Sequence, residues 1–115
     1  MNLSDFYRKK GTFLTPIDQH YALIDQDRER IIILNETAAW IWSRLGSDTA
    51  APIALRKDAE DFIATLDTYE LLAPTSPESE NLEPLGRVNG KPAVLKVAPL
   101  QVAAANSTDP FDLGW

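Results

Sequence analysis

A chain of 115 residues has room for one domain, and a hydrophobic content of 44% suits a soluble globular core. The absence of cysteine excludes disulfides, thiolate metal sites and cysteine nucleophiles, and it is compatible with a reducing cytoplasmic location. The net charge of −6 argues against nucleic acid as a ligand, because nucleic-acid binding usually needs a basic surface. No signal peptide or membrane-spanning stretch is recognisable, so we expect a cytoplasmic protein without membrane contact.

The first third of the chain has the patterns of β-strands. Thr12 to Ile17 is short, and Pro16 restricts it to an edge or an end of a sheet. His20 to Asp25 alternates weakly, and Arg30 to Leu34 is rich in β-branched residues. The polar residues 26–29 predict a tight turn, so the two longer strands are expected to form an antiparallel hairpin.

A helix with one apolar face is predicted directly after the third strand. Asn35 can cap its first turn, where the negative charge of Glu36 is favoured by the helix dipole. The apolar residues recur at helical spacing: Ala38, Ile41, Trp42 and Leu45. Gly46 suits the left-handed residue that ends such a helix. Trp40 lies off this face, where it packs within the molecule or contacts a partner.

Two further helices are expected before the chain changes character near residue 74. A short helix from about Ala50 to Leu55 tolerates Pro52 in its first turn. A longer helix begins near Asp58, continues through Leu72 and is stopped by Pro74. Strands followed by helices predict an α+β fold.

No residues have a spacing typical of a catalytic or metal site. His20 is the only histidine and has no nucleophile motif beside it. Asp25 and Asp27 lack the glycine and the closing glutamate of a calcium loop. Gly86 and Gly90 do not form a phosphate-binding loop. We therefore expect a protein that is not an enzyme and uses no metal or cofactor.

The last predicted helix has an acidic face. Its carboxylates are Asp58, Glu60, Asp61, Asp67 and Glu70. Most of them lie opposite the apolar residues of the same helix, which favours a solvated face. Contact between some of these carboxylates and a basic peptide is the functional alternative.

Two segments resemble a known family. Residues 31–42, IIILNETAAWIW, are similar to the strand-to-helix signature of the PqqD-like proteins, which are peptide chaperones also called RiPP recognition elements. LNETAA is the most specific part of this similarity. Residues 58–72, DAEDFIATLDTYELL, are similar to the last helix of that family. The resemblance covers about residues 11–73.

The resemblance implies a winged-helix-like fold with a three-stranded antiparallel sheet followed by two or three helices. In this family, which acts in natural-product biosynthesis, the leader of a ribosomally made precursor peptide adds as a strand beside the third strand, in a groove against the last helix. The chaperone then presents the peptide to a separate maturation enzyme, such as a radical SAM protein, a cyclase, a kinase or a protease. Backbone bonds along the edge give affinity, and pockets for alternate side chains give selectivity. Carried over to this chain, the implied peptide-binding residues are Arg30, Ile31, Ile32, Ile33, Leu34, Asp58, Asp61, Phe62, Thr65, Leu66 and Tyr69.

The chain continues for about forty residues beyond this domain. We expect a peptide-binding domain over residues 1–73, a flexible linker over 74–90, and a tail over 91–115 with a short strand near residues 93–97. The tail is passive and disordered, or it folds back so that its strand occupies the groove as a leader mimic or autoinhibitor. In a third interpretation it is a docking segment for the enzyme or a fused substrate, with alternating apolar anchors: Phe111, Leu113 and Trp115.

Two other functions remain as alternatives. A transcription regulator would need a basic recognition helix, but residues 58–72 contain no Lys or Arg. A scaffold subunit of a larger assembly would use the same domain without a leader peptide. The exposed strand edge also allows a homodimer.

Overall fold

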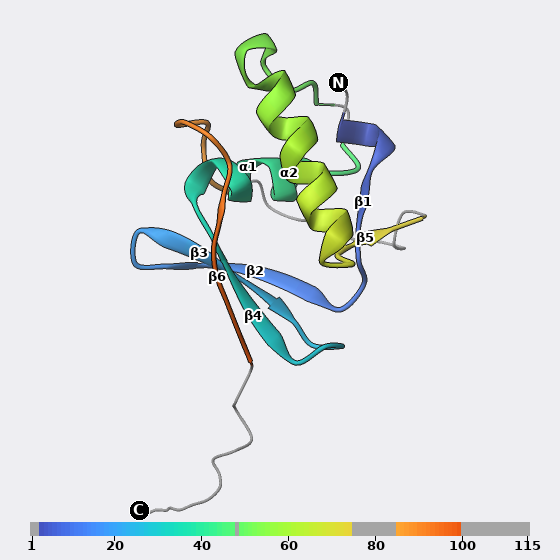
Figure 1. Cartoon of the computed structure of the whole chain (residues 1–115), viewed down its shortest axis with the longest axis vertical. Helices are drawn as coiled ribbons and strands as arrows, with labels where there is room; N and C mark the ends of the chain where they lie inside the picture. The colour runs from blue at the N-terminus through green and yellow to red at the C-terminus, as the bar shows by residue number, and fades with distance from the viewer. Residues whose placement is uncertain (1–2, 48, 75–84, 100–115) are drawn as a thin grey trace, which may run out of the picture.

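A computed structural model describes residues 3–47, 49–74 and 85–99 of the chain. These residues form two layers, in which a four-stranded antiparallel sheet packs beneath two α-helices (Figure 1). The predicted α+β class is therefore confirmed. The elements are η1 (Leu3–Asp5), β1 (Tyr7–Arg8), β2 (Thr12–Ile17), β3 (His20–Asp25), β4 (Arg30–Leu34), α1 (Glu36–Arg44), η2 (Ile53–Leu55), α2 (Arg56–Thr68), β5 (Leu72–Ala73) and β6 (Val94–Pro99).

Strands β2, β3 and β4 have the bounds that the sequence predicts. Pro16 lies in β2, which forms an edge of the sheet, as expected for a residue without a backbone N–H. The turn between β3 and β4 closes with a bond from the Glu29 N–H to the Gln26 carbonyl, 3.3 Å long. Glu29 has a φ of 52°, so the tight turn forms without the glycine or asparagine that usually provides this conformation.

The expectation of a three-stranded sheet is wrong, because the tail contributes a fourth strand. Strand order within the sheet is β2-β3-β4-β6, so β6 lies at the edge that β4 would otherwise expose. The two strands pair antiparallel from Arg30 opposite Pro99 to Leu34 opposite Val94, with a bulge near Leu34. The family resemblance covers only residues 11–73, so it could not include this strand. The tail does contain a strand near the predicted residues 93–97, displaced by one or two positions.

Helix α1 forms as its sequence predicts. The side chain of Asn35 accepts a hydrogen bond from the Ala38 N–H at 2.9 Å, which caps the first turn. Gly46, with a φ of 80°, follows the last turn. Trp40 is half-buried against the core, and the Arg44 guanidinium lies 4.5 Å from its ring centroid in a cation–π contact.

The remaining helical predictions need two corrections. The segment from Ala50 to Leu55 forms only the 3-10 helix η2, with Pro52 preceding it. Helix α2 ends at Thr68, before the predicted end at Leu72. Glu70 takes a left-handed φ of 59°, and the Leu71 N–H bonds back to the Leu66 carbonyl, which is a Schellman end without glycine. Leu72 then begins β5, which pairs with β1 in a small separate sheet.

The core lies between the helices and the sheet. Its fully buried large side chains come from every part of the domain and include Trp42, Leu3, Leu23, Ile32, Leu34, Ile41, Leu66 and Leu71. Arg8 of β1 donates to the carbonyls of Trp42 and Leu45, at 3.3 and 2.7 Å, at the carboxyl end of α1. A cation is favoured at this end of a helix, so Arg8 joins the amino-terminal segment to α1.

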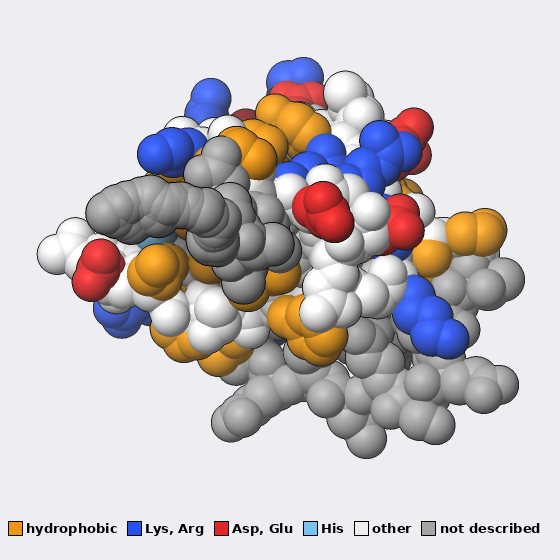
Figure 2. Space-filling model, turned by 90° about the horizontal axis from the view of Figure 1, so that it is seen from below, with side chains coloured by type: hydrophobic (Ala, Val, Ile, Leu, Met, Phe, Trp, Pro, Cys, Tyr) orange, Lys and Arg blue, Asp and Glu red, His pale blue; other side chains and the backbone are white. Residues whose placement is uncertain are grey.

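Both edge strands of the main sheet have exposed apolar side chains. Phe13 and Ile17 of β2, and Leu95 and Val97 of β6, are exposed to solvent. Seen from below, hydrophobic side chains appear in several groups among acidic and basic ones on this face (Figure 2). The exposed apolar side chains of β6 distinguish it from a strand in the interior of a sheet.

Asp25 forms a buried ionic cluster at the end of β3. Its carboxylate is fully buried and accepts from Arg30 Nε at 3.0 Å and from Lys9 Nζ at 3.2 Å. Burial raises the pKa of Asp25, but hydrogen bonds from Arg30 and Lys9, together with their charges, outweigh this and leave the pKa below its ordinary value of 3.8. Asp25 is therefore a structural anion that joins β3 to β4 and to Lys9, the residue directly after β1.

We predict that Asp25→Asn lowers the free energy of unfolding at pH 7 by about 2 kcal/mol, because two cations lose their shared anion. The pKa of Asp25 is lower in the folded than in the unfolded chain, so its contribution is present above about pH 4 and is lost as the pH falls through the folded-state pKa. Urea unfolding of the original chain and the variant should show a difference in free energy of unfolding that becomes smaller near pH 2.

Asp27→Asn is the matched control for this prediction. Asp27 also lies near Lys9, at 3.1 Å, but its side chain is 71% exposed. Exposed ion pairs contribute little, so this variant should cost less than about 0.5 kcal/mol. The free energies of unfolding of the original chain and the Asp25→Asn variant could also differ by the same amount at pH 7 and near pH 2. That result would contradict the role of Asp25 as a structural anion.

Candidate functional site

The candidate site is the edge of β4 together with the α2 surface beside it. All five predicted strand residues lie on β4: Arg30, Ile31, Ile32, Ile33 and Leu34. The core side chains of Ile32 and Leu34 lie directly opposite Val97 and Val94 of β6. Residues that are directly opposite in an antiparallel pair share one face of the sheet. Val94 packs against the core on this face, whereas Val97, farther along β6, is exposed to solvent.

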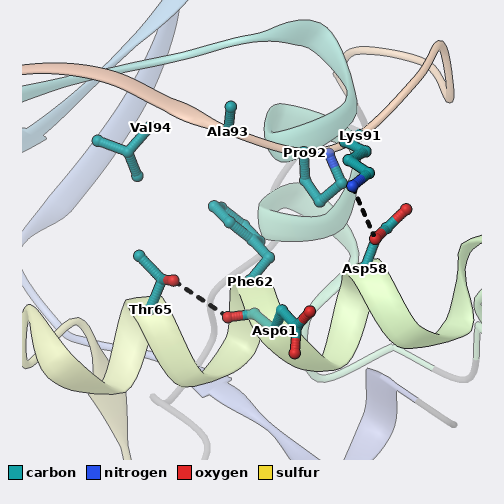
Figure 3. A pocket seen from close by; sticks show the side chains of 8 residues that line it. All are labelled: Asp58, Asp61, Phe62, Thr65, Lys91, Pro92, Ala93 and Val94. Carbon is teal, nitrogen blue, oxygen red and sulfur yellow. Dashed lines mark hydrogen bonds and ion pairs between the residues drawn. The ribbon is translucent and has the colours of Figure 1, made fainter.

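A pocket lies between α2 and the segment that leads into β6 (Figure 3). Four predicted site residues of α2 form one wall, and four tail residues form the other. The lining residues are Asp58, Asp61, Phe62, Thr65, Lys91, Pro92, Ala93 and Val94. The Phe62 ring points from α2 toward the tail segment, and Lys91 Nζ lies 4.0 Å from an Asp58 carboxylate oxygen. The structure thus brings four α2 residues to the predicted groove, where one acidic residue meets a basic residue of the tail.

The last two predicted site residues have different positions. Leu66 is fully buried in the core, where it supports the groove from within. Tyr69 lies just beyond the end of α2, and its ring centroid is 5.7 Å from the Arg30 guanidinium. The Tyr69 carbonyl also accepts a hydrogen bond from Arg30 Nη2. Arg30 is the first residue of β4, so this contact links the strand to the end of the helix that borders the pocket.

Sequence reasoning missed a second part of the site, at the junction of β4 and α1. Asn35 exchanges bonds with Ala93 just before β6: its backbone N–H donates to the Ala93 carbonyl at 3.2 Å, and its side-chain oxygen accepts from the Ala93 N–H at 3.1 Å. Asn35 Nδ2 donates to the Lys91 carbonyl at 2.7 Å. The predicted cap residue therefore also binds the tail.

Glu36 and Thr37 form further hydrogen bonds with residues 87 and 89. One Glu36 carboxylate oxygen accepts from Asn89 Nδ2 at 2.8 Å, and the other accepts from Arg87 Nε at 3.1 Å. The Thr37 hydroxyl accepts from the Asn89 N–H at 2.8 Å. Hydrogen bonds from Asn89 and then Arg87 hold the pKa of Glu36 below its ordinary value. We refer to Asn35, Glu36 and Thr37 as the junction site.

Residues 85 and 86 of the predicted linker lie along the rest of α1. The Leu85 carbonyl accepts from Ser43 Oγ at 3.1 Å and from Arg44 Nη1 at 3.2 Å. A Cβ at Gly86 would lie only 2.4 Å from the Glu36 carbonyl oxygen, so the backbone of Gly86 touches the helix. The described residues of the predicted linker thus follow α1 closely up to the start of β6. Residues 75–84 and the anchors predicted at Phe111, Leu113 and Trp115 lie outside the described residues.

The described parts of the chain contain no group of three or more His, Asp or Glu side chains placed to hold a metal ion. Within the same residues, no helix combines the length and the apolar character needed to cross a membrane. Asp25 and Asp27, the pair considered for a calcium loop, instead contact cationic side chains of the same chain. The features of the described site are hydrogen-bonding edges, a small pocket and the charges beside it.

Comparisons with known proteins add no relative. The chain matches no protein-family model, no curated protein and no solved structure. The likeness to PqqD-like proteins therefore depends on residues 31–42 and 58–72 themselves. Any function has to be argued from the geometry of the groove and the junction site.

We predict that Gly86→Ala releases the tail from α1, because the new methyl group would overlap the helix backbone. The Asn89 and Ala93 amides, which donate to Thr37 and Asn35, should then exchange with solvent about tenfold faster or more. Amide hydrogen exchange measured by NMR would test this.

Gly90→Ala is the control for Gly86→Ala. Gly90 also has a positive φ, 82°, but a Cβ there would meet nothing within 4 Å. The control thus includes the backbone strain of about 1–2 kcal/mol without the overlap. Equal exchange rates in the two variants would mean that the close contact of Gly86 with α1 does not hold the tail in place.

Proposed function

We propose that this protein is a non-catalytic peptide chaperone that binds an extended peptide by strand addition at the edge of β4. One observation carries the proposal: the chain's own β6 pairs antiparallel with this edge over the whole of β4, beside the pocket on α2. The edge therefore has the register and the space for a peptide strand. In this proposal, β2, β3, β4, α1 and α2 constitute the winged-helix-like unit that the family resemblance implies.

The physical basis of binding is the same for β6 and for an external strand. Unpaired N–H and C=O groups of β4 form backbone bonds with any extended peptide, and alternate side chains of that peptide face α2. Phe62 offers an apolar contact in the pocket, whereas Asp58 and Asp61 offer negative charge. The proposed ligand is therefore an extended peptide with alternating apolar residues and a basic residue near the start of the strand, where Lys91 lies in this chain.

The resemblance of residues 31–42 and 58–72 to PqqD-like proteins supports a particular ligand, the leader of a ribosomally synthesised precursor peptide. The chaperone would present this leader to a separate maturation enzyme in the cytoplasm. In this proposal, the side chains at the β4 edge and in the pocket bind the leader and orient it. The modification chemistry would belong to the separate enzyme. A radical SAM protein, a cyclase, a kinase and a protease all fit this arrangement.

A second function, autoinhibition or carriage of a fused substrate, is favoured by the presence of β6 on the edge. A tether of about ten to twenty residues gives an effective concentration in the millimolar range. Even a weakly binding segment would then occupy the groove most of the time. An external leader would have to displace β6 before it could pair with β4.

We predict that a chain ending at residue 73 binds a leader peptide about tenfold more tightly or better than the full chain, because no tethered strand competes. Titration with leader peptides encoded beside the gene, followed through backbone amide shifts, would measure both affinities. Shifts should concentrate in β4 and along α2.

The amide spectrum of the shortened chain also provides the control, because retained α1 and α2 signals show that it is folded. Equal affinity of the two chains would remove the autoinhibition proposal. A lack of binding by both chains would contradict the chaperone function and favour a scaffold subunit.

A further inference from the structure

The junction site and β4 contact different parts of the chain after residue 84. Six hydrogen bonds join Asn35, Glu36 and Thr37 to residues 87–93, which precede β6. The β4 edge bonds to β6 through backbone groups that every residue except proline has. Two of the junction bonds, by contrast, come from the side chains of Arg87 and Asn89. The junction site is therefore able to distinguish one peptide sequence from another.

Glu36 is the residue that provides this discrimination. Its two oxygens are used separately, one by Asn89 Nδ2 and the other by Arg87 Nε. Both contacts are charge-assisted hydrogen bonds, which are stronger than neutral ones. An apolar or acidic side chain in place of either donor would leave a carboxylate oxygen without its partner. The backbone contact of Gly86 adds a steric requirement for a residue without a Cβ.

Asn35 has more contacts than its role as a helix cap requires. An Asp or Ser side chain caps a helix as well as Asn, because the cap needs only an acceptor. Asn35 also accepts from Ala93 through Oδ1 and donates to the Lys91 carbonyl through Nδ2. The amide of Asn35 provides the donor and the acceptor from two different atoms, Nδ2 and Oδ1, whereas an ionised Asp side chain provides acceptors alone. The capping and peptide-binding roles of Asn35 can therefore be separated by the substitution Asn35→Asp.

From these contacts, and resting on the proposed function, we infer that the junction site is a second recognition site that selects peptides by the segment preceding the added strand. The ligand class is a peptide that contains a glycine, an arginine and, two residues after the arginine, an asparagine. An extended apolar strand follows, starting five residues after the asparagine. These intervals are the ones between Gly86, Arg87, Asn89 and Val94 in the tail. The tail is thus a template for the external ligand.

Displacement of the tail in the full chain tests this inference. A protease recognition sequence replaces residues 77–82, and the folded protein is then cut so that its carboxyl-terminal piece is held only by non-covalent contacts. Fluorescent peptides with the sequence of residues 85–99 compete for the site, and their anisotropy gives affinities. We expect the unaltered peptide to bind, and a peptide with Asn89→Ala to bind about tenfold more weakly, because it loses a charge-assisted bond.

Leu95→Thr in the same peptide is the matched control. Leu95 is 47% exposed on β6, so this change should alter the affinity by no more than about twofold. In the chain itself, Asn35→Asp should weaken binding of the unaltered peptide by about tenfold while the amide signals of α1 stay unchanged. The cap is retained in this variant, so a loss of affinity reports the peptide contact.

The outcomes separate this inference from the proposed function. Equal affinities of the unaltered and Asn89→Ala peptides would overturn the junction site as a selective element, while strand addition at β4 would stand. If no peptide bound, including the Leu95→Thr control, strand addition itself would fail and both proposals would be overturned. The inference is supported if the Asn89→Ala peptide binds more weakly while the Leu95→Thr peptide does not, and if Asn35→Asp in the chain weakens binding of the unaltered peptide.

Discussion

The backbone groups along the edge of β4 impose the constraint on which the rest of this structure depends. N–H and C=O groups at a sheet edge are left unpaired unless another strand, water or a covering element satisfies them. In this chain β6 pairs with them, and the segment before β6 is directed to the edge by the junction site. The path of the tail is thus determined at two points, by side-chain contacts at α1 and by backbone pairing at β4.

The surrounding domain keeps both points in place. Arg30 joins β4 to the buried Asp25 and to the end of α2, so the strand and the helix that border the groove are connected at one end. At the other end, Asn35 caps α1 and binds the tail with the same side chain. The groove is therefore built on regular elements, which hold a binding geometry better than loops do.

Local signals made much of the domain predictable from sequence. Alternation and β-branched residues predicted β2 to β4, and the cap and closing glycine predicted α1. The end of α2 could not be predicted, because Glu70 takes a left-handed conformation that glycine usually provides. Strands β1 and β5 have two residues each and carry no recognisable pattern. The family resemblance predicted the parts of the site on β4 and α2. The junction site could not be predicted from local sequence, because its partners are distant in the chain: Lys91 is 56 residues from Asn35.

A reversible covalent lock between β4 and β6 tests the central claim most directly. The chain has no cysteine, so Ile31→Cys with Ala98→Cys, which lie directly opposite, would introduce a single thiol pair. We expect the disulfide to form on oxidation and to block binding of an external peptide, and reduction to restore binding. An oxidised, locked protein that binds peptide as tightly as the reduced one would contradict strand addition at this edge.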